Sequence, residues 1–155
     1  MARVKKVLLV GFICGALAVI VFHQGTLYVL HHQFALLKLI GVPDAFRPGA
    51  AGFNIRPVPP LGVPQVLSLA FWGGVWGIVL AGLIRWARLP DLLTGFVLGA
   101  VICTVVGFTL VAELRGVPMW AGGNTIVWAR AALLNGAFGW GAAFLMRPFS
   151  IGGGS

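Results

Sequence analysis

The chain has 155 residues, of which 59% are hydrophobic and only 9% charged, and its mean hydropathy is +1.00. Soluble domains carry about 25% charged residues, so too few are present here to cover a water-facing surface. The net charge of +8 would suit a nucleic-acid partner, but the lysines and arginines stand singly at the ends of apolar runs, as they do in membrane proteins. The composition therefore predicts a protein surrounded by membrane lipids and argues against nucleic acid as a partner.

Four apolar runs approach or exceed the length of about 20 residues that spans a bilayer. They predict transmembrane helices at about residues 5–30, 65–84, 91–112 and 124–146. The expected fold class is all-α, an integral-membrane four-helix bundle, with residues 1–151 forming a single transmembrane domain. Residues 152–155, Gly-Gly-Gly-Ser, are typical of an artificial linker and are excluded from the fold.

The first apolar run has the basic start of a secretory signal, with Arg3, Lys5 and Lys6 before an apolar segment. It stays apolar as far as Leu30 and has no clear small-residue cleavage pattern. A retained first helix is therefore expected rather than a cleaved signal.

The segment between the first two helices is rich in proline. Proline removes a backbone donor and interrupts helices, so residues 41–64 are predicted to be a loop lying over the bundle. Its prolines are Pro43, Pro48, Pro57, Pro59, Pro60 and Pro64. Residues 31–40 are too short to span and could form an interfacial turn or two.

Four spans place both termini on one side of the membrane. The numbers of cations on the two sides are nearly equal, but those at the N-terminus, at Arg85 and Arg88, and at Arg147 crowd the helix ends. Such positions weigh most in the positive-inside rule. We therefore expect a bacterial inner-membrane protein with cytoplasmic termini and a periplasmic proline-rich loop.

Glycines recur at small-xxx-small spacing, which lets helix backbones approach closely in lipid. The pairs are Gly11 and Gly15, Gly73 and Gly77, and Gly95 and Gly99. They predict close packing within the bundle; an interface between copies of the chain is the alternative.

Polar side chains in hydrocarbon are costly and need a partner or a function. Most of those in the predicted spans fall in one leaflet, which suggests a polar pocket open to the periplasm. Helical periodicity places Asn124, Trp128, Ala131 and Asn135 on one stripe, and Gly99, Cys103, Val106, Leu110 and Glu113 on another. The candidate ligand-binding residues are His23, Gln24, Ser68, Trp72, Glu113, Asn124, Arg130 and Asn135. Trp76, one turn from Trp72, could wall the same groove.

A structural explanation of these polar residues stays open. Glu113 and Arg130 could neutralise each other, Asn135 could bond across helices, and His23 could satisfy a backbone carbonyl. Arg130 could also extend to the lipid headgroups.

No metal site or cofactor is predicted, because all three histidines, His23, His31 and His32, belong to the first span or its exit. Catalysis is not favoured either. The only carboxylates, Asp44, Asp91 and Glu113, are far apart in sequence, and no catalytic motif is present. No catalytic residue is assigned.

The chain resembles a family of small four-helix inner-membrane proteins of proteobacteria. The resemblance rests on Phe22-His23-Gln24-Gly25, Pro60-Leu61-Gly62-Val63-Pro64, Leu69-Ala70-Phe71-Trp72-Gly73-Gly74 and Leu134-Asn135-Gly136. It implies the four-span topology but carries no activity or site residue.

The expected function is non-enzymatic: an accessory subunit of a membrane-protein partner, or a binder of a lipid or small ligand. An oligomeric channel or transporter for a small solute is the alternative, and a homo-oligomer would be needed to enclose a pore. A third hypothesis is an enzyme that acts on a lipid or quinone through His23 and Glu113.

Overall fold

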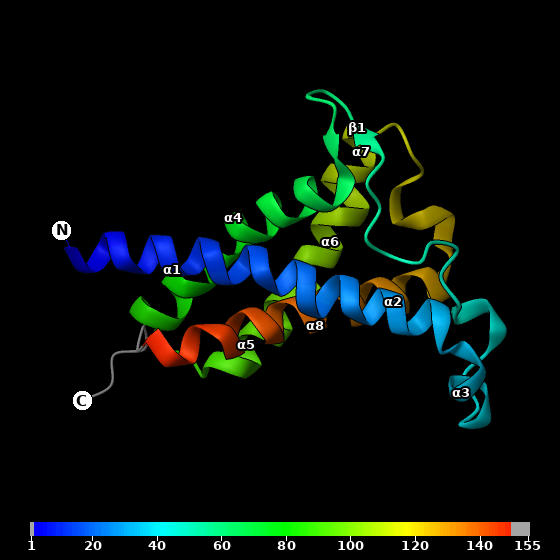
Figure 1. Ribbon diagram of the computed structural model, residues 1–155, viewed down its shortest axis with the longest axis horizontal. Helices are drawn as coiled ribbons and strands as arrows, with labels where there is room; N and C mark the ends of the chain where they lie inside the picture. Colours follow the sequence, from blue (N-terminus) through cyan, green and yellow to red (C-terminus); the bar gives the residue numbers. More distant parts are fainter. Residues whose placement is uncertain (1, 150–155) are drawn as a thin grey trace.

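The structure, a computed structural model, describes residues 2–149, and these are mostly helical (Figure 1). The expected linker at residues 152–155 lies outside the described residues. The all-α fold class is confirmed. The proline-rich segment adds one pair of short antiparallel strands.

Two of the long helical segments contain π-helical turns. The first segment joins α1 (Ala2–Ala18), a π turn (Val19–His23) and α2 (Gln24–His32). Another joins α5 (Asp91–Val97), a π turn (Leu98–Cys103), α6 (Thr104–Val106), a second π turn (Gly107–Val111) and α7 (Ala112–Leu114). A π turn bonds residue i to i+5 and often occurs at functional sites.

The two remaining long helices are regular, and local sequence explains where they start. The helix α4 (Gln65–Trp86) begins directly after Pro64, and α8 (Thr125–Met146) begins after Asn124. Oδ1 of Asn124 accepts hydrogen bonds from the backbone N–H groups of Ile126 and Val127 at 3.1 and 3.2 Å, which is an N-cap. Asn124 is therefore explained by helix capping.

The segment between α2 and α4 is more structured than a plain loop. It contains α3 (Phe34–Leu39), a 3₁₀ turn (Asp44–Phe46) and two short strands, β1 (Pro57–Val58) and β2 (Val63–Pro64). The strands pair antiparallel, with Pro57 opposite Pro64 and Val58 opposite Val63. Gly62, at φ +66°, provides the left-handed residue of the connecting turn. Two further 3₁₀ turns cover Met119–Gly123 and Arg147–Phe149.

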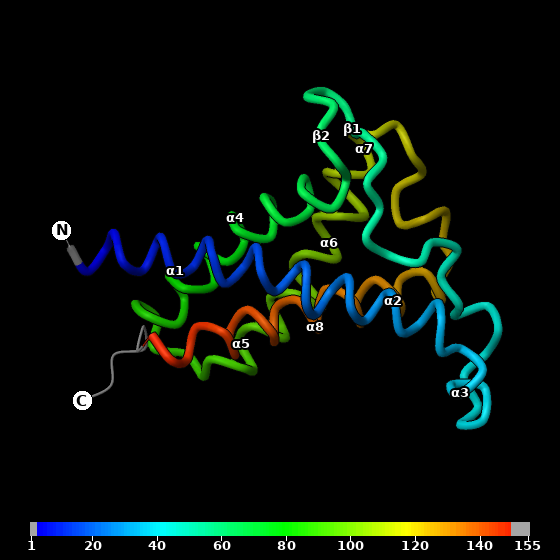
Figure 2. The backbone as a smooth tube through the Cα atoms, in the orientation of Figure 1, coloured from blue at the N-terminus to red at the C-terminus, as the bar shows by residue number. Residues whose placement is uncertain are grey.

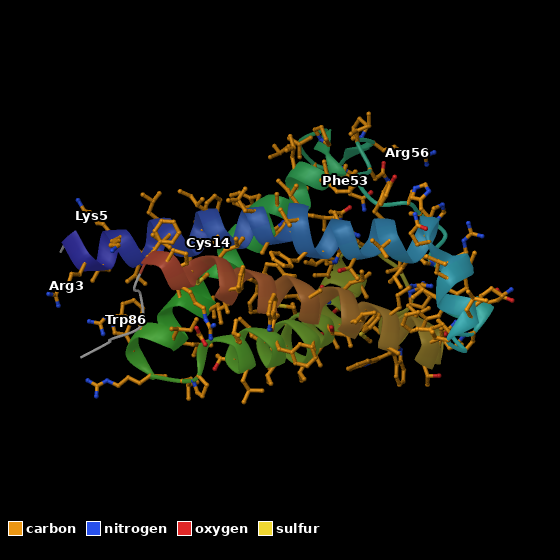
Figure 3. All side chains as sticks on the ribbon, turned by 60° about the horizontal axis from the view of Figure 1, so that its bottom comes forward. Arg3, Lys5, Cys14, Phe53, Arg56 and Trp86 are labelled. Carbon is orange, nitrogen blue, oxygen red and sulfur yellow. The ribbon has the colours of Figure 1, made fainter. Side chains whose placement is uncertain are left out.

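The long segments run alternately back and forth. Figure 2 shows the tube leaving the N-terminus along α1 and α2, returning along α4, going out again from α5 to α7 and returning along α8. Arg3, Lys5 and Trp86 lie at one end of the molecule and Phe53 and Arg56 toward the other (Figure 3). We call these the terminal end and the loop end. At the terminal end Arg147 forms an ion pair with Asp91 at 2.6 Å, which joins the end of α8 to the start of α5.

Three helical segments among residues 2–149 are long and apolar enough to span a membrane by length and composition. They cover residues 3–32, 65–86 and 91–114. The helix α8 also has 22 residues but is not one of the three. It contains Arg130 and Asn135, and many of its other positions are glycine or alanine.

Glycines hold the helices together in two seams, which confirms the packing expected from their spacing. In the first seam α1 meets α4, and a Cβ added to Gly15 would overlap the carbonyl of Gly73. In the second α5 and its π turn meet α8, and a Cβ added to Gly99 would overlap the carbonyl of Asn135. The buried core between the seams includes Ala18, Leu80, Phe138 and Ala142. This close backbone contact fixes how far along each helix the side chains of neighbouring helices meet.

Candidate functional site

A partly open pocket of about 140 Å³ lies in the middle of the helical body. Every long helical segment contributes to it. Its lining consists of Val19, His23, Leu69, Trp72, Gly73, Trp76, Cys103, Asn135 and Phe138. Most of these groups are apolar or aromatic, with a few polar groups among them, which is the usual composition of a small-molecule site.

The two π turns next to the pocket place three of its residues, Val19, His23 and Cys103. His23 is the last residue of the π turn between α1 and α2, and Cys103 is the last residue of the π turn after α5. The aromatic wall comes from α4, where Trp72 and Trp76 are one turn apart. Trp72 is 57% exposed, so it stands at the rim while its neighbour lies further in.

Asn135 is held by a hydrogen-bonded chain across two helices. Its Nδ2 donates to Oγ1 of Thr104 at 3.0 Å, and that hydroxyl donates to the carbonyl of Gly99 at 3.4 Å. Thr104 is buried. Asn135 therefore bonds across helices, as the structural explanation expected, and also lines the pocket.

His23 is held by its sequence neighbour. Nδ1 of His23 lies 3.1 Å from Nε2 of Gln24, and Oε1 of Gln24 accepts a hydrogen bond from the backbone N–H of Phe53 at 2.7 Å. Gln24 is only 3% exposed. Its side chain does not line the pocket; it connects the pocket histidine to the 41–64 loop.

Three of the eight residues predicted to bind a ligand line this pocket: His23, Trp72 and Asn135. Ser68 is half-buried on α4 without lining it. Glu113 is exposed near the end of α7, and Asn124 is an exposed helix cap. The pocket was predicted to include these three side chains and to reach the loop end, but none of them lines it.

Glu113 and Arg130 form no ion pair in the described part of the chain, so that suggestion is wrong. Arg130 instead donates through Nη1 to the carbonyls of Phe46 and Arg47, at 3.5 and 3.2 Å. His31 makes a similar contact, with Nδ1 3.0 Å from the carbonyl of Pro48. These bonds fasten the 41–64 loop over the loop end of α2 and α8.

The π turns explain why the predicted stripe on the third segment fails. Leu110 is 56% exposed and Glu113 is also exposed, although Gly99 on the same stripe is buried against α8. The stripe assumed an α-helical period, whereas the wider turns at 98–103 and 107–111 shift the phase of every residue after them. Val19, Leu69, Gly73 and Phe138 line the pocket but were not predicted, because apolar residues in a span give no sequence signal of a site.

Comparisons with known proteins gave no match: no protein-family model fits the chain, and neither curated proteins nor solved structures show significant similarity to it. The resemblance to small proteobacterial four-helix proteins therefore stays a prediction.

Proposed function

We propose that the chain is a multi-pass protein of the bacterial inner membrane and that its mid-helix pocket binds a small amphiphilic ligand taken from the bilayer. The surface supports the first part. Large apolar side chains are exposed along the helices, among them Leu9 at 61%, Leu67 at 56% and Phe71 at 53%. Water would disfavour so large an apolar surface, whereas acyl chains would cover it.

The helix α8 is proposed as a fourth span. A helix at the centre of a bundle meets protein on several sides and so needs less apolar surface than a helix that faces lipid. Eight residues of α8 are buried: Leu134, Gly136, Phe138, Gly139, Gly141, Ala142, Ala143 and Met146. The Arg147–Asp91 pair places its last turn beside the start of α5, as a full return crossing requires.

The terminal end is proposed to be cytoplasmic, because its cations stand at the helix ends where they determine orientation. At the loop end the guanidinium of Arg130 donates its hydrogen bonds to carbonyls of the loop, so it is not a free cation at a helix end. Cysteine labelling tests this topology: after replacement of Cys14 and Cys103, Leu61→Cys should react with an impermeant maleimide on spheroplasts. Leu89→Cys should react only after lysis, and the reverse pattern would invert the topology.

The pocket is the observation that carries the binding function. Two polar side chains from different helices, His23 and Asn135, line a cavity with an aromatic wall in an otherwise apolar environment. Each is bonded to one neighbouring side chain, Gln24 or Thr104, yet each still lines the cavity. A purely structural polar group would be expected to be enclosed by its partners. The third hypothesis, acid–base chemistry by His23 and Glu113, is disfavoured because Glu113 does not line the pocket.

Mass spectrometry of the protein purified from native membranes tests the binding function. One small amphiphile should be retained at near-stoichiometric amount. Cys103→Phe, which fills the pocket, should lose it, whereas Val101→Phe, on the exposed face of the same π turn, should retain it. Equal retention, or no ligand in any form, would contradict the proposal.

A further inference from the structure

The hydrogen bonds around Gln24 determine which ring nitrogen of His23 carries the proton. A backbone N–H can only donate, so the Gln24 atom that meets the N–H of Phe53 must be the amide oxygen. The amide nitrogen of Gln24 therefore faces Nδ1 of His23, 3.1 Å away. An amide nitrogen only donates, which makes Nδ1 the acceptor.

In a neutral imidazole with an accepting Nδ1, the proton sits on Nε2. His23 therefore offers one N–H donor from Nε2. This atom has no hydrogen-bond partner within residues 2–149, and its side chain lines the pocket. A second proton on Nδ1 would bring two donors face to face, so the arrangement keeps the ring uncharged.

The same reasoning orients Asn135. The hydroxyl of Thr104 has one hydrogen, and it points to the carbonyl of Gly99, which can only accept. Its oxygen must then accept from the amide nitrogen of Asn135. The amide oxygen, Oδ1, is left as an acceptor, and no group among the described residues donates to it.

Both atoms reach open space. In the described part of the chain, every side-chain nitrogen or oxygen that is sealed from solvent has a hydrogen-bond partner. Nε2 of His23 and Oδ1 of Asn135 have none, so they are accessible, and the pocket is the space their side chains line. No charged side chain lines it with them. His23 thus presents a donor to the pocket and Asn135 an acceptor, beside the indoles of Trp72 and Trp76 and the thiol of Cys103.

We propose, resting on the binding function above, that the ligand is an uncharged amphiphile whose head is a hydroxyl group. Its oxygen accepts from Nε2–H of His23, and its hydrogen goes to Oδ1 of Asn135. A carboxylate or ammonium head would be buried without a counter-ion, and an ether or ketone would leave Asn135 unpaired. A cavity of about 140 Å³ holds a group about the size of benzene, so an alkyl chain leaves past the exposed rim at Trp72.

Competition binding to the full chain in lipid nanodiscs tests this, with tritiated 1-dodecanol as the probe and empty nanodiscs as the blank. Dodecyl methyl ether, dodecanoate and dodecylammonium compete at equal membrane mole fraction. We expect the alcohol to bind about tenfold more tightly than the ether, the effect of one hydrogen bond, and the two ions to bind least. Asn135→Leu should remove the alcohol–ether difference, while His23→Phe should weaken both.

The ring ¹⁵N shifts of His23 provide a second readout that needs no variant at Asn135. They should show the Nε2–H form, assigned by loss of the signal in His23→Phe. Equal affinity for alcohol and ether, tighter binding of dodecanoate, or an Nδ1–H ring would overturn the hydroxyl assignment while leaving a binding pocket. Unchanged dodecanol binding in Cys103→Phe would instead overturn the binding function itself.

Discussion

Gln24 and Phe53, 29 residues apart, are joined by a hydrogen bond of 2.7 Å from the backbone N–H of Phe53 to the buried amide oxygen of Gln24. Phe53 has a left-handed backbone, with φ at 50°, which is costly for a residue other than glycine. The bond helps to hold that conformation. It also orients the amide that meets His23, so the loop and the pocket depend on one side chain.

Replacement of Gln24 with leucine should therefore destabilise the chain. The change leaves the N–H of Phe53 without its partner, at an expected cost of about 1–3 kcal/mol. Thermal unfolding in detergent micelles provides the measurement. Gln33→Leu is the matched control because Gln33 is exposed, and it should unfold like the parent chain. If the two variants unfolded at the same temperature, the loop bond would contribute nothing.

The second glycine seam predicts a difference between two glycines of the same helical segment. A Cβ at Gly99 would overlap the backbone of Asn135, whereas a Cβ at Gly107 would meet nothing within 4 Å. We expect Gly99→Ala to destabilise by about 1–3 kcal/mol, as other overpacked positions do. Gly107→Ala should be neutral or stabilising by about 0.5–1 kcal/mol. Unfolding in mixed micelles with SDS measures both, and equal stability of the two variants would rule out the seam.

The Asn135–Thr104 bond predicts energetic coupling between α8 and α6. Asn135→Leu and Thr104→Val each remove it, so the double variant should lose less stability than the two single losses together. Interhelical hydrogen bonds in membranes couple by about 0.6 kcal/mol on average and up to about 1.7 kcal/mol. A double-mutant cycle from SDS unfolding measures the difference. Additive losses would mean that the bond contributes no stability.

The helical part of the fold could be predicted from sequence because its signals are local. Long apolar runs set the helices, and Asn124, Pro64 and Pro90 mark where three of them begin. The glycine seams followed from spacing alone. The strands β1 and β2 were not predicted, because a pairing of two residues on each side leaves no alternating pattern to detect.

The candidate site could be predicted only in part. His23, Asn135 and Trp72 were found because polar and aromatic residues stand out in an apolar chain. The partner of Gln24 is a backbone N–H in a distant loop, which no side-chain pattern reveals. The residues facing the bundle on the third segment were also predicted incorrectly. An α-helical period extended from one end of this segment is no longer valid after each wider π turn.

Arg130 and Glu113 are predicted to act independently. Arg130 donates to the carbonyls of Phe46 and Arg47, whereas Glu113 is exposed, so no shared contact connects their effects. Arg130→Gln should release the loop and cost about 1.5–3 kcal/mol, the range for hydrogen bonds to a charged group. Glu113→Gln should change stability by less than about 0.5 kcal/mol, as exposed substitutions do.

Limited proteolysis of residues 40–56 and thermal unfolding check this pair of variants. The Arg130→Gln loop should be cleaved faster, the Glu113→Gln loop at the parent rate, and the double variant should resemble Arg130→Gln alone. A double variant more stable than either single one would show that the two charges do pair, because each single change would then strand a charge in a poorly solvated place. In that case the contacts of Arg130 with the loop carbonyls would not be its main interaction.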